Sequence, residues 1–439
     1  MTAPLQIAMA IGSVAVLLGL MAVVRAVAPV LSIGSEMQRK LIHVGTGLYA
    51  LALPWLFPDR WPVYSLVGVT LLVMLVLRMP RSRLGTTLHG VERQSYGDLL
   101  LALSVGLCLF MADDRLYLYV LPLSILTLAD AAAALAGTRY GSRFFAVEDG
   151  IKSVEGSAVF FTVALLIAIT CLMLMTPIAP ANILILSVLV AAFGTLVEAV
   201  SWRGFDNLFL PLGVLIFLKG HADDTMPEML VFAAVFVVSV VAFKLVAPRI
   251  GLNHHAARVY VITVFLLLAV TEVQNAVLPV LVLAAHGWAR ISRPCTATYP
   301  ALDVVAGLAL VSFGWLTLGN ATGWNAVSFY GVTAMGMMMA LCAIACQGLG
   351  VSAKPAVLGI IAVASCGAWA VITGLNPASA NWNGPMWPMV LACLALAALV
   401  PSLAPRIFAG ARVARLTVMA LAIPLTTYLT SIGLAGIAR

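Results

Sequence analysis

Charged residues are scarce in this sequence. Lys, Arg, Asp and Glu together make up 9% of its 439 residues, whereas hydrophobic residues make up 63%. A soluble domain of this composition would expose a large apolar surface to water, so a water-soluble globular protein is excluded. We therefore predict an all-α fold, a polytopic bundle of transmembrane helices in the lipid bilayer.

Cysteine pairs are also lacking. The seven cysteines are scattered, mostly inside apolar runs, and no C-x-x-C pair occurs. This distribution favours small buried residues over a zinc site or a disulfide framework.

No basic segment precedes the first apolar run, and the nearest basic residues, Arg25 and Arg39, follow it. We therefore expect a retained first span with the N-terminus outside, not a cleaved signal peptide. If later loops alternate sides, the outward loops of the first half hold only Arg60, Arg115 and Lys219 among its Lys and Arg residues. The net charge of +7 then reflects topology in a bacterial inner membrane, and no nucleic-acid partner is predicted.

Apolar runs separated by short loops predict about fifteen or sixteen membrane spans. They lie near residues 5–24, 41–57, 62–77, 98–112, 117–137, 156–176, 181–201, 208–218, 228–247, a hairpin over 259–288, 303–319, 326–347, 355–374, 386–404 and 416–436. The short run 208–218 is interpreted as a half-helix or re-entrant segment lined by protein.

The loop from Pro248 to Arg258 is the predicted domain boundary, which divides the chain into residues 1–250 and 251–439. Acids and bases recur near the ends of spans before this loop, whereas polar residues thin out after it. The role of the second half stays open: it could move or seat a lipid product, or form a homodimer surface.

Asp130 carries the strongest functional signal, because an acid within an apolar segment is costly unless paired or hydrated and is usually functional. With about 3.6 residues per turn, Asp130, Ala134, Gly137 and Gly141 share one helix face. The small residues on this face allow another backbone or a ligand to approach closely.

Lys152 and Glu155 follow in a mixed-charge loop that closes on Gly156 and Ser157, where the next apolar run begins. Gly156 permits close backbone approach, and the N-terminus of the new helix offers N–H groups to an anion. Together with Asp130, these residues have the ingredients of a metal–phosphate site, although solvated loop charges would look similar.

Arg39, Lys40 and His43 lie where the second span begins, on the same inward side as Asp130. Lys40 and His43 share a helix face, which could hold a phosphate group. The alternative is a snorkelling cluster that only fixes the topology.

Glu198, Asp206 and Asn207 form a further inward cluster. Glu198 lies near the end of a span, and the other two precede the short run 208–218, which Pro211 is expected to break. Oxygen-rich side chains suit a divalent cation that bridges nucleotide phosphates, with ordinary loop polarity as the alternative.

Taken together, these pieces resemble the CTP-dependent lipid kinases that act on polyprenol, phytol, dolichol or diacylglycerol, which are related to the phosphatidate cytidylyltransferases. The matching pieces are Glu36-x-x-Arg39-Lys40-x-x-His43, Asp130-Ala-x-Ala-x-x-x-Gly137-x-x-x-Gly141, Lys152-Ser-x-Glu155-Gly156-Ser157, and Glu198 with Asp206-Asn207-x-x-x-Pro211-Leu. The resemblance covers about residues 30–247 and implies CTP as donor, Mg2+ as cofactor, and a membrane-embedded isoprenoid alcohol or diacylglycerol as acceptor. Many members carry Gly before the acid, where this chain has Ala129, so kinase and nucleotidyltransferase chemistry both stay open.

Each candidate residue has an expected role on this reading. Catalysis is assigned to Asp130, Lys152, Glu155 and Glu198; nucleotide or substrate binding to Arg39, Lys40, His43, Gly137, Gly141, Gly156, Ser157 and Asn207; and Mg2+ binding to Asp130, Glu155, Glu198 and Asp206. A lipid transporter or flippase would instead place polar residues deep within its spans. The polar residues of the first half lie near inward span ends, which favours an enzyme that uses a cytosolic nucleotide.

Overall fold

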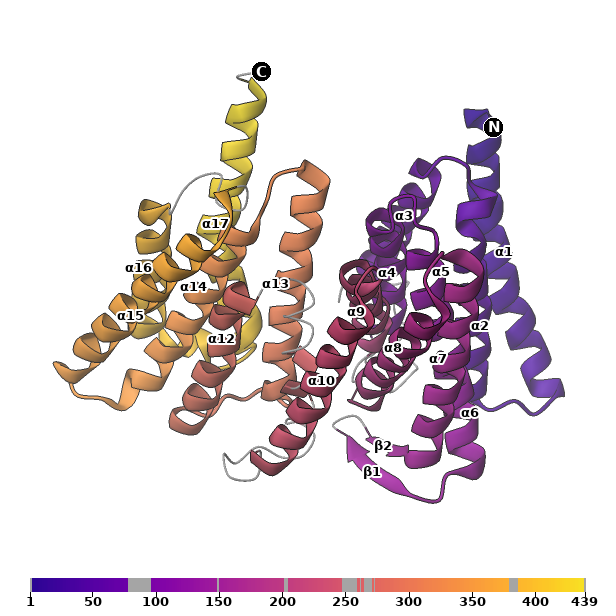
Figure 1. Cartoon of the computed structure of the whole chain (residues 1–439), viewed down its shortest axis with the longest axis horizontal. Coiled ribbons are helices and arrows are strands. Elements are labelled where there is room, and N and C mark those ends of the chain that lie inside the picture. Colours follow the sequence, from indigo (N-terminus) through magenta and orange to yellow (C-terminus); the bar gives the residue numbers. More distant parts are fainter. Residues whose placement is uncertain are drawn as a thin grey trace. The chain divides into compact units, whose positions relative to one another are not determined.

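The computed structural model describes residues 2–437 except 78–95, 148–149, 201–203, 247–258, 261, 264–270, 272 and 379–385. It divides into two compact units, Met1–Val238 and Ser239–Arg439 (Figure 1). Among the described residues, eight helices are long and apolar enough to cross a membrane, and three shorter apolar helices accompany them. The predicted class, a helical membrane protein, is therefore confirmed.

The helices of the first unit follow the predicted apolar runs to within a few residues. They are α1 (Ala3–Val30), α2 (Ser35–Leu56), α3 (Trp61–Leu77), α4 (Gly97–Met111), α5 (Tyr117–Ser124), the π-helical turn η2 (Ile125–Ala129), α6 (Asp130–Tyr140), α7 (Val154–Met175), α8 (Pro180–Val200) and α9 (Asp206–His221), and α10 (Met226–Val246) begins in this unit and continues past its last residue, Val238. α5, η2 and α6 follow one another without a break and form one candidate span, Tyr117–Tyr140, where the span 117–137 was predicted. A π-helical turn is rare and is found mostly at functional sites.

Helix α9 is the buried centre of the first unit. Every residue from Asn207 to Leu218 is buried, so protein lines this short segment as expected. The prediction that Pro211 breaks it is wrong, because α9 runs through Pro211 to His221. Proline removes one backbone hydrogen bond, and packing of α9 on all sides against α4, α5 and α8 keeps the helix continuous.

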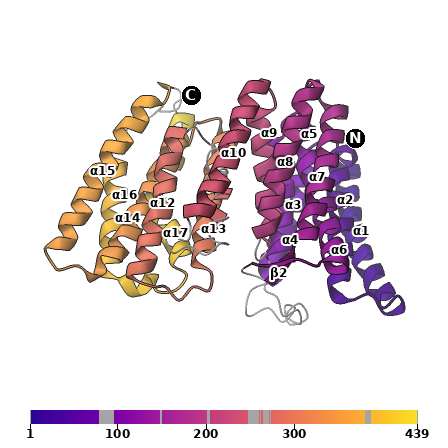
Figure 2. The same cartoon turned by 60° about the horizontal axis from the view of Figure 1, so that its bottom comes forward.

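The mixed-charge loop after α6 contains a short antiparallel hairpin. Strand β1 (Phe144–Val147) pairs with β2 (Gly150–Ser153), and Phe145 lies opposite Lys152. Figures 1 and 2 show the hairpin beside the ends of α6 and α7. Lys152 therefore projects from a strand and not from an irregular loop.

The second unit is a bundle around α14 (Val327–Ala345), whose residues from Ser328 onward are all buried. Around it pack α12 (Val273–Ser292), α13 (Pro300–Thr322), α15 (Ala353–Leu375), α16 (Trp387–Leu403) and α17 (Arg412–Ile437), with short 3-10 turns η4 (Cys346–Gly348) and η6 (Pro405–Phe408). The predicted boundary loop 248–258 and the predicted hairpin turn at Glu272 lie outside the described residues.

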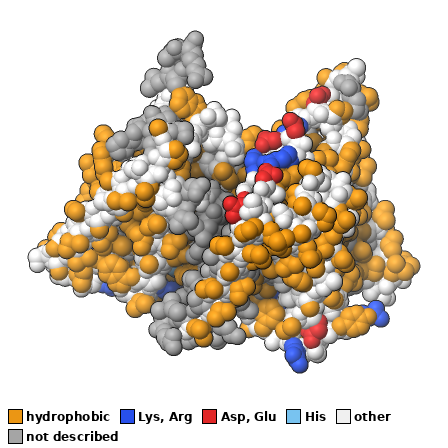
Figure 3. Space-filling view, viewed as in Figure 1, with side chains coloured by type: hydrophobic (Ala, Val, Ile, Leu, Met, Phe, Trp, Pro, Cys, Tyr) orange, Lys and Arg blue, Asp and Glu red, His pale blue; other side chains and the backbone are white. Residues whose placement is uncertain are grey.

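Large apolar side chains cover the outer surfaces of the helices. Leu174 on α7 is 79% exposed and Leu403 on α16 is 81% exposed. In Figure 3 the charged side chains of the visible face gather toward helix ends, and hydrophobic side chains fill the bands between them. This pattern is unfavourable in water and is expected where lipid chains surround the helices.

Candidate functional site

Asp130 is the first residue of α6, directly after the π-helical turn, and it pairs with Lys40 of α2. The Asp130 Oδ2 atom lies 2.6 Å from the Lys40 Nζ atom and 3.9 Å from the His43 Nε2 atom. Each of the three side chains is only 12% exposed. The buried acid is thus compensated by one lysine, and His43 completes a partly enclosed polar cluster.

Lys152 of β2 forms a second pair with Glu198 of α8. Its Nζ atom lies 2.6 Å from the Glu198 Oε1 atom and also donates to the Glu198 carbonyl oxygen. The hairpin carries Lys152 to the end of α8, where the Glu198 side chain is 10% exposed.

The two pairs lie close enough to influence each other. Lys152 is within electrostatic range of Asp130, and Asp130 is within range of Glu198. Asp206, the first residue of α9, is also within electrostatic range of Glu198. Five elements, α2, α6, β2, α8 and α9, therefore bring two lysines and three carboxylates to one end of the first unit.

Glu155 has different neighbours. Its carboxylate accepts hydrogen bonds from the Ser142 hydroxyl and from the Arg143 backbone N–H at 3.2 Å. None of its described contacts reaches Asp130 or Glu198. Glu155 joins α7 to the turn before the hairpin, so the structure gives it a positioning contact and not a place among the clustered carboxylates.

The small residues of α6 and α7 allow two backbones to approach closely. A Cβ atom on Gly156 would lie 2.9 Å from the Ala133 carbonyl oxygen and 3.3 Å from the Gly137 Cα atom. The small-residue face of α6 was expected to meet either another backbone or a ligand. The structure places the backbone of α7 against it. This crossing of α6 and α7 fixes Asp130 relative to Lys152.

The N-terminus of α7 is capped within the chain. The Ser153 hydroxyl accepts a hydrogen bond from the Gly156 N–H at 3.0 Å, which removes one N–H group that was expected to face an anion. Sequence reasoning missed this role of Ser153, although a serine directly before an apolar run is a helix-start signal. The Ser157 hydroxyl is buried and has no hydrogen-bond partner among the described residues.

The remaining predicted residues lie around this cluster. Arg39 is exposed one position before Lys40, and the Asn207 side chain donates to the Gly97 carbonyl oxygen at 2.8 Å, which ties α9 to α4. Gly141 follows the last residue of α6 and caps it. The side chain of Glu36 lies outside the described residues.

The predicted Mg2+ site fits the donors only in part. Within the described ranges, no three His, Cys, Asp or Glu side chains form a group that could hold a metal alone. Mg2+ in nucleotide sites commonly uses one or two carboxylates together with phosphate oxygens. Asp130 and Glu198 suit that sparse donor set, with Asp206 within electrostatic range of Glu198, whereas Glu155 has no described contact with them.

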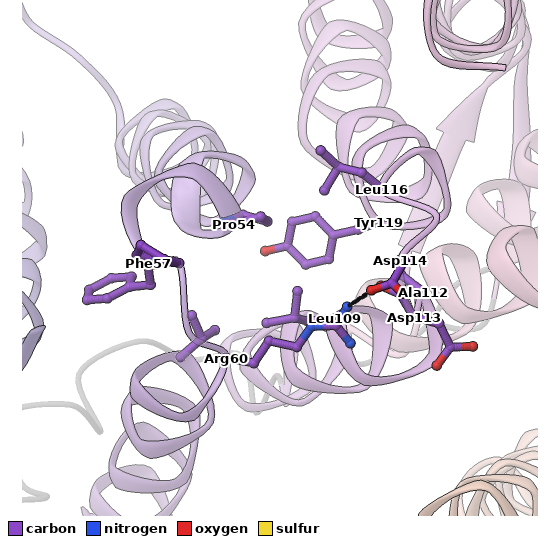
Figure 4. Close-up of a pocket in the computed structure, with 11 residues that line it drawn as sticks. Pro54, Phe57, Arg60, Leu109, Ala112, Asp113, Asp114, Leu116 and Tyr119 are labelled. Atoms are coloured by element: carbon purple, nitrogen blue, oxygen red, sulfur yellow. Dashed lines mark hydrogen bonds and ion pairs between the residues drawn. The ribbon is translucent and has the colours of Figure 1, made fainter. Parts of the chain in front are cut away.

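A cavity of about 210 Å³ lies at the opposite end of the first unit. Figure 4 shows Arg60, Asp113 and Asp114 beside Tyr119 there, with Arg60 paired to Asp114 at 3.3 Å. Lys219 is 3.0 Å from Asp113. Arg60 and Lys219, from loops predicted to face outward, thus pair with Asp114 and Asp113, away from the Asp130 cluster.

Comparison with known proteins gives one informative match. A phytol kinase from Synechocystis sp. is 31% identical to the chain over 183 residues, which are 41% of this chain and 76% of that protein. No family model and no solved structure matches the chain.

Fold and site together define an integral membrane protein with a cluster of lysine–carboxylate pairs at one end of its first helical unit. The extent of the sequence match then identifies the family: the chain belongs to the phytol kinase-like family.

Proposed function

We propose that the protein is a membrane lipid kinase that transfers the γ-phosphoryl group of CTP to an isoprenoid or similar lipid alcohol at the cytosolic face of a bacterial inner membrane. One observation carries this proposal: the Lys40–Asp130 and Lys152–Glu198 pairs meet at one end of a helical unit in a relative of a phytol kinase. Paired lysines and carboxylates are the groups that phosphoryl transfer needs for positioning and charge compensation.

The reaction is a displacement at phosphorus. The oxygen of the lipid alcohol forms a bond to the γ-phosphorus, the bond from that phosphorus to the β,γ-bridging oxygen breaks, and CDP leaves with the bond's electron pair. The hydroxyl proton passes to a carboxylate, for which Asp130 and Glu198 are the candidates. The apolar tail of the acceptor stays in the lipid, and the hydroxyl reaches the cluster from the membrane side.

The two lysines change partners in this scheme. In the described structure each lysine neutralises one carboxylate. When the nucleotide binds, Lys40 and Lys152 turn toward phosphate oxygens, as lysine does in other phosphate sites. Asp130 and Glu198 would then be the residues that hold Mg2+, with Asp206 nearby, and the ion would supply charge compensation for the phosphoryl group.

Product analysis tests the proposal. Purified protein is incubated with Mg2+, either CTP or ATP, and a panel of prenols, diacylglycerol and phosphatidic acid, and both products are identified by mass. A lipid monophosphate together with CDP is expected. A CDP-lipid with pyrophosphate would indicate a cytidylyltransferase, and intact nucleotide with every acceptor would contradict both activities. Vesicle-to-vesicle lipid movement without nucleotide turnover would favour a transporter.

A further inference from the structure

Acidic residues are almost absent from the second unit. Its sequence contains Glu272 and Asp303 and no other carboxylate side chain. Basic residues gather where α12 ends and α17 begins, with Arg290 near the end of α12 and Arg412 as the first residue of α17. This basic end has no role in the proposed kinase site, whose residues all belong to the first unit.

Arg412 is a buried cation at this end. The residue is 4% exposed. Its Nε atom donates to the Phe408 carbonyl oxygen at 3.2 Å and its Nη2 atom to the Pro294 carbonyl oxygen at 3.4 Å. Its Nη1 atom is buried and has no hydrogen-bond partner in the described part of the chain. Two backbone carbonyls therefore orient the guanidinium, and its Nη1 group, which carries two N–H donors, has no partner among the described residues.

His286 of α12 is a second buried group with an unused nitrogen. It is fully buried, and its Nδ1 atom lies 3.4 Å from the Tyr260 hydroxyl. Its Nε2 atom has no partner among the residues described. Arg290, exposed one helical turn further along α12, and Arg412 are both within electrostatic range of His286. The Arg412 contact with Pro294, two residues after the end of α12, places this guanidinium at the same end of the unit as Arg290.

No carboxylate compensates this cluster in the described part of the second unit. The ionisable neighbour that acts on Arg412 is the Cys295 thiol. A guanidinium stays charged under all ordinary conditions, and burying an unpaired charge is unfavourable because it loses its hydration. An anion from outside the chain would remove this cost.

We infer that His286, Arg290 and Arg412 form a binding site for a phosphate monoester group. A guanidinium donates two hydrogen bonds in a fixed fork, and phosphate offers several oxygens at matching spacing. Two arginines call for an anion with more than one negative charge, which favours a phosphate monoester over a carboxylate. Basic pockets between membrane helices near the water boundary are suited to lipid headgroups, so a lipid phosphate and a free phosphate share this chemistry.

Binding measurements on the full-length protein test the inference. The protein is purified in a non-ionic detergent without phosphate or nucleotide, and its affinity is measured for inorganic phosphate, for short-chain phosphatidic acid, and for phosphatidylcholine with the same acyl chains. We expect phosphatidic acid or phosphate to bind and phosphatidylcholine to bind much more weakly. Phosphatidic acid binding more tightly than phosphate assigns the site to a lipid headgroup, whereas equal affinity assigns it to free phosphate.

Two arginines of α17 provide a matched pair of variants. Arg412→Gln should weaken binding about tenfold or more, because a charge-assisted hydrogen bond is lost. Arg415→Gln makes the same change at an exposed position one turn away and should bind like the wild type. If Arg412→Gln does not fold, His286→Gln takes its place and should weaken binding several-fold.

Several results would overturn the site: no binding of either phosphate probe to the wild type, equal binding of phosphatidylcholine, or equal losses in Arg412→Gln and Arg415→Gln. The comparison of Arg412→Gln with Arg415→Gln involves no nucleotide turnover, so its result is independent of whether the kinase proposal holds.

Discussion

Asp130 and Glu198 can be buried because each carboxylate has a lysine partner. The sequence identified Asp130 from its position alone, since an acid inside an apolar segment demands an explanation. It could not identify the partner, because Lys40 lies 90 positions away in the chain and only the packing of α2 against η2 brings the two together. Lys152 and Glu198 were both candidates, and their pairing across 46 positions was equally hidden.

The Lys40–Asp130 pair separates stability from catalysis. Lys40→Met leaves a buried carboxylate without its cation and should destabilise the protein by about 3 kcal/mol. Adding Asp130→Asn removes that charge and should restore most of the lost stability, while turnover stays abolished in both variants. Thermal unfolding in detergent and turnover with CTP measure the two effects. If the double variant is as unstable as Lys40→Met, the loss of stability does not come from an unpaired Asp130 carboxylate.

The two glutamates near the hairpin should respond differently to the same substitution. Glu198→Gln removes the charge that pairs with Lys152 and should lower kcat at least about 100-fold, an effect of about 2.7 kcal/mol. Glu155→Gln keeps an oxygen that can accept from Ser142 and Arg143, so its kcat should stay within about tenfold of the wild type. Steady-state kinetics with CTP compare them. An equal loss of kcat in both variants would show that Glu155 is a catalytic residue after all.

Helices were easier to predict than the details that position the site. Long apolar runs mark spans directly, because a helix must satisfy its own backbone in lipid. The hairpin of β1 and β2 was missed because each strand has four residues and no clear alternation of polar and apolar side chains. The π-helical turn before Asp130 has no sequence signal that we recognise, and it appears only once α5 and α6 are packed.

The crossing of α6 and α7 should be intolerant of a single methyl group. Gly156→Ala places a Cβ atom 2.9 Å from the Ala133 carbonyl oxygen, so the helices must separate, at a cost of about 1–3 kcal/mol. Separation would also shift Asp130 relative to Lys152 and lower turnover. Thermal unfolding and kinetics of the same preparation measure both consequences.

Gly68→Ala is the matched control for this crossing. Gly68 lies inside α3, and a Cβ atom there would meet none of the described residues within 4 Å. Alanine should therefore stabilise this helix by about 0.5–1 kcal/mol and leave turnover unchanged. If Gly156→Ala is as harmless as Gly68→Ala, close backbone contact is not needed for the site.

For the molecule as a whole, the kinase proposal requires the Asp130 cluster and the Arg60–Asp114 end to face opposite sides of the membrane. Arg139→Cys, exposed in the last turn of α6, marks the first end, and Asp114→Cys marks the other. The excess of Lys and Arg in the loops on the Asp130 side predicts that this side is cytosolic. A membrane-impermeant maleimide should therefore label Asp114→Cys in right-side-out vesicles and Arg139→Cys only in inverted vesicles, with the unsubstituted protein as background. Labelling of both cysteines from the same side would contradict the predicted spans. The reverse pattern would place the Asp130 cluster on the outer side of the membrane, where it could not use cytosolic CTP, and would contradict the proposed reaction.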